Sequence, residues 1–180
     1  MFRMPHRLLL CLASVFAVAG CGVTDVTGLR VSVDNGLLPD TALKRGSQSQ
    51  LAIAIQIGNG TGVDIHPSGL VFVDHLGGPN QSVSDFTAVR VFDGSREVGR
   101  LEPRATPAEL ALVITDPGLT VRGGQTLTLA VRVDVSSSAA VGAPHQFELI
   151  KGALSASAVP PLFTRFQSDN SLLGRQLVIR

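Results

Sequence analysis

Apolar and polar residues alternate most strictly between residues 126 and 135. Every second residue there is a leucine or a valine, and the residues between them are Thr126, Thr128, Ala130, Arg132 and Asp134. A period of two places one face of a β-strand in a core and the other in water. The pattern therefore predicts a half-buried strand over residues 126–135.

The same period, carried by branched apolar residues, occurs repeatedly along the chain. It predicts strands at 29–33, 51–57, 70–74, 86–92, 96–101, 110–114 and 177–180. Two further candidates, 145–150 and 153–158, are separated by Lys151-Gly152. Turn sequences such as Asp34-Asn35-Gly36 and Asp93-Gly94 lie between strands. No window after Cys21 keeps helical spacing, so the pattern indicates an all-β fold.

Short strands separated by Gly- and Pro-rich turns predict an antiparallel β-sandwich. The run from Thr126 to Leu149 and the hairpin RVFDGSREVGRL resemble strands of immunoglobulin-like modules in secreted bacterial proteins. This resemblance implies an immunoglobulin-like sandwich, and a jelly roll is the competing architecture. We expect one such domain over residues 29–180.

The first twenty residues have the pattern of an export signal. Arg3 and Arg7 precede an uncharged apolar run, Leu8 to Ala19, and the first acidic residue is Asp25. A membrane-spanning helix needs about 20 apolar residues. This run is shorter, so we expect a cleaved signal helix over residues 1–20.

The end of that run, Val18-Ala19-Gly20-Cys21, resembles the lipobox of bacterial lipoproteins. The resemblance implies cleavage between Gly20 and Cys21 and attachment of a diacylglyceryl group to the Cys21 sulfur. Residues 21–28 would then be a short lipidated tether. Because Ala17-Val18-Ala19 is also an A-x-A cleavage site, an ordinary secretory signal stays open as the alternative.

Lipidation would place the domain on the extracytoplasmic face of the cell membrane. Gly22 after the cysteine resembles lipoproteins sent to the outer membrane, if the host has one. Without Arg3 and Arg7 the chain has 13 basic and 14 acidic residues, a net charge of −1 with neutral histidines. No basic patch is visible in the sequence, so we expect no nucleic-acid partner.

Cysteine and aromatic content narrow the function classes further. Cys11 leaves with the signal and Cys21 carries lipid, so the domain has no disulfide. The chain contains eight Phe but neither Trp nor Tyr. The flat aromatic platforms common in glycan-binding domains are therefore not expected.

Candidate metal ligands occur in two pairs. Asp64 and His66 share one face of an extended segment, and Asp74-His75 follows a few residues later. A zinc site commonly needs three or four ligands. We interpret these residues as polar strand ends and expect no metal and no other cofactor.

Arg90 and Arg132 lie on the polar faces of two predicted strands. If those strands are neighbours, the two arginines form an exposed patch for an acidic partner; otherwise they solubilise the faces. Ser136-Ser137-Ser138 lacks the G-x-S-x-G pattern of a nucleophile elbow, and no catalytic residues are predicted.

The sequence therefore predicts a membrane-anchored envelope lipoprotein with a structural or protein-binding β-sandwich and no enzymatic activity. Its expected contacts are the membrane, through the N-terminal lipid, and an envelope protein. The alternative is a lipoprotein that binds a glycan, a metal ion or a small apolar molecule, with an enzyme as a more distant option.

Overall fold

The computed structural model describes residues 28–37, 41–77, 84–101, 110–156, 162–164 and 172–180. The strands are β1 (Leu29–Val33), β2 (Ala42–Leu43), β3 (Gln50–Asn59), β4 (Ile65–Asp74), β5 (Phe86–Asp93), β6 (Arg96–Leu101), β7 (Leu110–Ile114), β8 (Thr126–Val135), β9 (Pro144–His145), β10 (Phe147–Ala156), β11 (Leu162–Thr164) and β12 (Leu177–Ile179). A 3-10 turn, η1, covers Asn35–Leu37. The predicted signal, Cys21 and the tether up to residue 27 lie outside the described residues.

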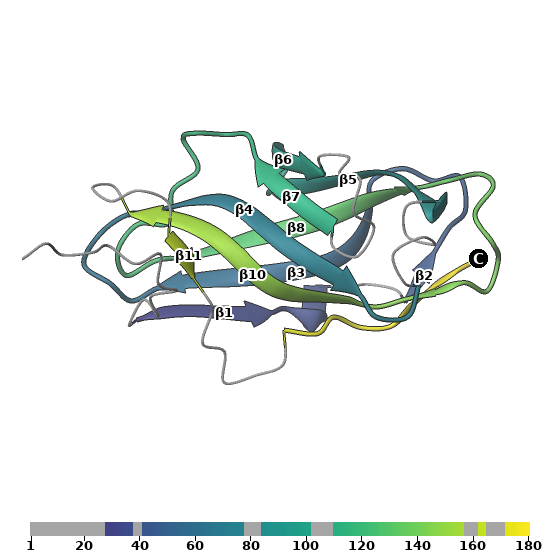
Figure 1. Cartoon of the computed structure of the whole chain (residues 1–180), viewed down its shortest axis with the longest axis horizontal. Helices are drawn as coiled ribbons and strands as arrows, with labels where there is room; N and C mark the ends of the chain where they lie inside the picture. Colours follow the sequence, from purple (N-terminus) through teal and green to yellow (C-terminus); the bar gives the residue numbers. More distant parts are fainter. Residues whose placement is uncertain (1–27, 38–40, 78–83, 102–109, 157–161, 165–171) are drawn as a thin grey trace, which may run out of the picture.

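Nine strands form one curled sheet in the order β1-β3-β8-β5-β6-β7-β4-β10-β11, and every neighbouring pair is antiparallel. Figure 1 shows β4 and β10 crossing over β3 and β8, as in a sandwich. The all-β, antiparallel β-sandwich predicted from the alternation is confirmed. Non-consecutive neighbours such as β3–β8 and β4–β10 are Greek-key features, which immunoglobulin-like and jelly-roll sandwiches share.

One hydrophobic core lies between the two halves of the curled sheet. Its largest fully buried side chains come from both halves: Ile53, Ile55, Ile57 and Leu129 from one, and Leu70, Phe72, Leu112 and Leu149 from the other. Burying one such side chain contributes about 1.5–3 kcal/mol. Among the described residues, no helix has the length and apolar character needed to cross a membrane.

A small second sheet covers one end of the sandwich. Its central strand, β12, pairs in parallel with β2 and antiparallel with β9. Leu43, Leu177 and Ile179 from this sheet join the main core. The C-terminal strand predicted at residues 177–180 is therefore present and anchors that end.

Strand boundaries agree with the prediction where one face meets water and the other meets core. Strand β8 spans the predicted residues, and its alternate residues from Leu129 to Val135 are buried. Two strands differ most from the prediction. Strand β10 runs unbroken through Lys151-Gly152 because a bulge after Leu149 absorbs the irregular pattern. Strand β4 begins at Ile65, with Pro67 next to a second irregularity that tolerates its missing N–H.

Candidate functional site

Three arginines form a row across neighbouring strands on the outer face of the sheet. Strands β5 and β8 are adjacent, and Arg90 lies directly opposite Arg132. On its other side Arg90 lies opposite Arg100 of β6. The alternate residues Val131 and Val133 are buried, so the arginines point away from the core. The strands that carry Arg90 and Arg132 are therefore neighbours, as the predicted patch requires. Arg100 extends the row.

Carboxylates placed beside the row offset the repulsion between facing arginines, which is destabilising when uncompensated. Arg90 Nη2 donates to both oxygens of Asp134, at 2.5 and 2.6 Å. Glu97 Oε1 lies 2.9 Å from Arg100 Nη2, and Glu97 Oε2 lies 4.0 Å from Arg90 Nη1. No carboxylate of the described residues forms an ion pair with Arg132. Three guanidinium groups thus face two carboxylates, which leaves a net charge of +1.

Arg132 is held by a backbone carbonyl and an aromatic ring. Its Nη1 donates to the carbonyl of Ser49 at 2.9 Å, and its Cζ lies 5.7 Å from the centre of the Phe92 ring. The Ser49 N–H donates to Asp134 at 2.7 Å. Ser49 has a φ of 55°, the one positive value among non-glycine residues that the structure describes. Such a conformation costs about 1–3 kcal/mol, so the two side-chain bonds hold a strained residue in place.

Apolar residues lie beside the arginine row. Ala130 of β8 lies opposite Ala54 of β3 on one side and opposite Phe92 of β5 on the other. Ala130 and Phe92 are partly exposed, whereas Ala54 is fully buried. Partly exposed apolar side chains beside positioned guanidinium groups are suited to contact another protein, since arginine and aromatic residues are enriched in protein interfaces.

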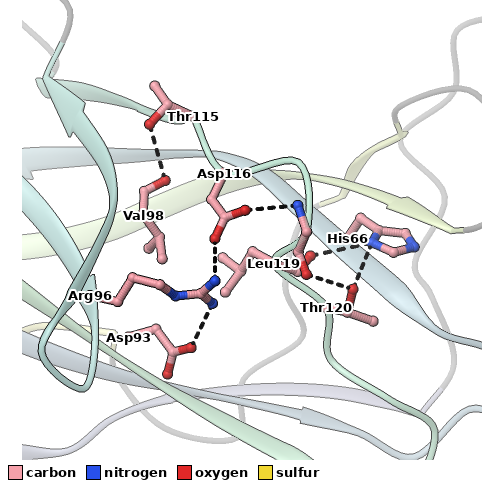
Figure 2. A network of polar contacts seen from close by, with 9 residues as sticks. His66, Asp93, Arg96, Val98, Thr115, Asp116, Leu119 and Thr120 are labelled. Carbon is pink, nitrogen blue, oxygen red and sulfur yellow. Dashed lines mark hydrogen bonds and ion pairs between the residues drawn. The ribbon is translucent and has the colours of Figure 1, made fainter.

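His66, one of the candidate metal ligands, lies at a shallow cleft of about 330 Å³. The cleft is lined by His66, Pro67, Ser68, Ile114, Asp116 and Pro117. Figure 2 shows that its polar groups hold the surrounding turn. Asp116 accepts the N–H of Gly118 at 2.8 Å and pairs with Arg96 at 2.7 Å. His66 Nδ1 lies 3.1 Å from Thr120 Oγ1. Contacts within the protein therefore account for the polar side chains of His66 and Asp116 at this cleft.

The other candidate ligands are not brought together around a common point. Asp64 accepts the N–H of Gly123 at 3.3 Å. Asp74 points into the core, whereas its neighbour His75 lies outside and pairs with Glu148. Within the described ranges, no three His, Cys, Asp or Glu side chains are placed to share a metal ion.

A buried polar cluster at the other end of the sandwich was not predicted. His145 Nδ1 lies 2.6 Å from Asp74 Oδ2, and His145 Nε2 lies 3.3 Å from Asp85 Oδ2 without hydrogen-bond alignment. The side chains of these three residues are at most 5% exposed. The rings of Phe86 and Phe147 lie 4.6 and 6.4 Å from the imidazole. The cluster joins β4, β9 and the start of β5, so it links the small sheet to the sandwich.

No sequence signal marks this cluster. Asp74 and His145 are 71 positions apart, and each stands at a strand end, where a polar residue is ordinary. Asp85 directly precedes β5 and looks like part of a loop. Only the pairing of distant strands brings the three side chains together, and a single sequence does not give that pairing.

Comparison with solved structures finds proteins whose backbones follow a similar path. No protein-family model and no curated protein matches the chain. A cohesin module from the family 33 glycoside hydrolase of Clostridium perfringens matches at 9% identity and a TM-score of 0.48, covering 86% of this chain and 98% of that one. A type I cohesin–dockerin complex from Clostridium thermocellum matches at 12% identity and a TM-score of 0.47, covering 84% and 99%. Matches at this level assign no partner to this chain.

Proposed function

We propose that this protein is a lipid-anchored envelope protein whose β-sandwich binds an acidic protein surface and performs no catalysis. The arginine row of Arg132, Arg90 and Arg100 is the observation that carries the proposal. The anchor is the lipidated Cys21. Two or more acyl chains hold a protein on a membrane stably, since each buried CH₂ contributes about 0.8 kcal/mol.

The contacts of the row support a binding role because its members are already positioned. Arg90 is fixed by Asp134, and Arg132 by Ser49 and Phe92. A side chain held before binding loses less conformational freedom when the partner arrives, and this raises affinity. Arg132 also lacks a carboxylate partner among the described residues, so an acidic group of another protein can pair with it.

Site-specific photo-cross-linking in the producing cells tests this role. A photoreactive residue at Thr128, on the same outer face of β8 as Arg132 and four residues before it, should form an adduct with one envelope protein. The cross-linked peptide should carry Asp or Glu side chains. Arg132→Glu should reduce the adduct about tenfold or more, because like charges facing each other across an interface cost several kcal/mol.

Two controls separate this face from the rest of the surface. The same photoreactive residue at Val71, on the outward side of β4 in the opposite layer, should give no such adduct. Arg45→Glu reverses the same charge at an exposed position that is not a member of the row and should leave the Thr128 adduct unchanged. Equal adducts from both layers, or a Thr128 adduct that survives Arg132→Glu, would contradict the proposal.

A further inference from the structure

A hollow of about 400 Å³ opens at the end of the sandwich where β1 begins. Arg30 of β1 lies opposite Gly58 of β3, and Gly58 lies opposite Thr126 of β8. The middle position has no side chain, so the arginine and the threonine stand on either side of a gap. The turn that carries Gly124 and Gln125 closes the hollow on the β8 side.

The backbone at this hollow is built for close approach. The N–H of Gly60 donates to the carbonyl of Gly28 at 2.8 Å. A Cβ on Gly60 would lie 2.8 Å from that oxygen, so a side chain there would force the two segments apart. Gly28 itself has a φ of 95°, which favours glycine. The glycines therefore keep the hollow both open and fixed in shape.

The hollow presents donors suited to a phosphate. Arg30 is exposed, and no carboxylate of the described residues pairs with it. The planar fork of a guanidinium matches phosphate oxygens, and the Thr126 hydroxyl and the Gln125 amide add further donors. Arg122, exposed and likewise without an ion pair in the described part of the chain, belongs to the turn that ends at Gln125. The acid that contacts this turn, Asp64, accepts the N–H of Gly123.

The position of the hollow indicates which phosphate it meets. Seven residues separate Cys21 from Leu29, the first residue of β1. A fully extended chain of that length spans about 25 Å. Resting on the lipid anchor of the proposed function, we propose that the hollow binds the phosphate headgroup of an anionic phospholipid. This contact holds the β1–β3–β8 end of the sandwich against the bilayer.

Two exposed valines at opposite ends of the domain make the proposal testable. Val63 is 55% exposed, and its carbonyl accepts the side-chain N–H of Asn59, which lines the hollow. Val141 is 65% exposed and follows the far end of β8. In the lipidated protein, a cysteine introduced at either position is labelled with a polarity-sensitive fluorophore. The protein is then anchored in vesicles of phosphatidylcholine alone or of phosphatidylcholine and phosphatidylglycerol in equal parts.

We expect the Val63 label to report a less polar environment only in the phosphatidylglycerol vesicles, and the Val141 label to be the same in both. Arg30→Gln should lower the ratio of docked to undocked protein about fivefold, the effect of one basic residue near an anionic surface. Arg45→Gln, which removes an exposed arginine outside the hollow, should leave the ratio unchanged.

Failure of the headgroup site is distinguishable from failure of the anchor. Protein that is anchored in both vesicle types but gives the same Val63 signal in each would overturn the headgroup site alone. If the protein isolated from the producing cells carried no lipid and bound neither vesicle type, the anchor and the headgroup site would both be wrong. If inorganic phosphate raised the melting temperature in phosphatidylcholine vesicles, and Arg30→Gln removed that rise, the hollow would be a site for free phosphate and the lipid assignment would be wrong.

Discussion

Replacing His145 with leucine is expected to lower the free energy of unfolding by about 3 kcal/mol, the upper end of the cost of leaving a buried hydrogen-bonding group without its partner. The imidazole lies between Asp74 and Asp85, and its side chain is fully buried. Leucine would leave Asp74 Oδ2 and Asp85 Oδ2 facing an apolar group. Urea unfolding monitored by circular dichroism measures the change. A domain of this size loses roughly 2–4 °C of melting temperature per kcal/mol, so a fall of about 10 °C accompanies it.

His75 provides the matched control for this prediction. It also pairs with a carboxylate, that of Glu148, but the two side chains are 45% and 33% exposed. Surface pairs contribute about 0–1 kcal/mol, so His75→Leu should change stability by less than 1 kcal/mol. Equal losses for the two variants would show that the buried cluster does not link the small sheet to the sandwich as described.

Gly99→Ala is expected to destabilise the domain by about 3 kcal/mol, at the upper end of the cost of overpacking. A Cβ at this position would lie 2.5 Å from the carbonyl oxygen of Val113 and 3.0 Å from the Cα of Ile114. Both are backbone atoms of β7, which do not move without separating β6 from β7. That pairing is where the curled sheet passes from one layer to the other.

Hydrogen exchange locates the damage. Amides of β6 and β7 should exchange faster in Gly99→Ala than in the parent protein, while those between β3 and β8 keep their protection. Gly62→Ala serves as the control, because a Cβ at Gly62 meets nothing within 4 Å and its φ lies outside the left-handed region. If both alanine variants were as stable as the parent, the close packing of β6 on β7 would be wrong.

The alternation of apolar residues was sufficient to predict the strands that have the core on one side and water on the other. Strand β8 is the clearest case, since its charged residues Arg132 and Asp134 could only face outward. The pattern was less informative for β3. A period of two over residues 51–57 assigns Ala52 and Ala54 to the face away from the core, yet both are at most 1% exposed. A small apolar residue is buried by its neighbours on the outer face, and periodicity does not report those neighbours.

For the candidate site, the sequence predicted which side chains face outward but not which strands are neighbours. Arg90 and Arg132 could be assigned to outward faces from their own strands, but their facing position depends on β5 pairing with β8. Arg100 was not predicted to join the row. The bulge in the pairing of β5 with β6 decides which residue of β6 lies opposite Arg90. The hollow at Gly58 also depends on a three-strand register. Register between distant strands follows from packing of the whole core, which local spacing does not encode.

The arginine row and the glycine-lined hollow both acquire their proposed roles from a single position on the membrane, set by Cys21. Intact-mass measurement of the protein extracted from the membrane fraction tests this most directly. We predict a mature chain of residues 21–180 that is heavier than its amino acids by at least a diacylglyceryl group. A soluble chain with an unmodified Cys21, or one that begins at Gly20 after cleavage at Ala17-Val18-Ala19, would contradict the account.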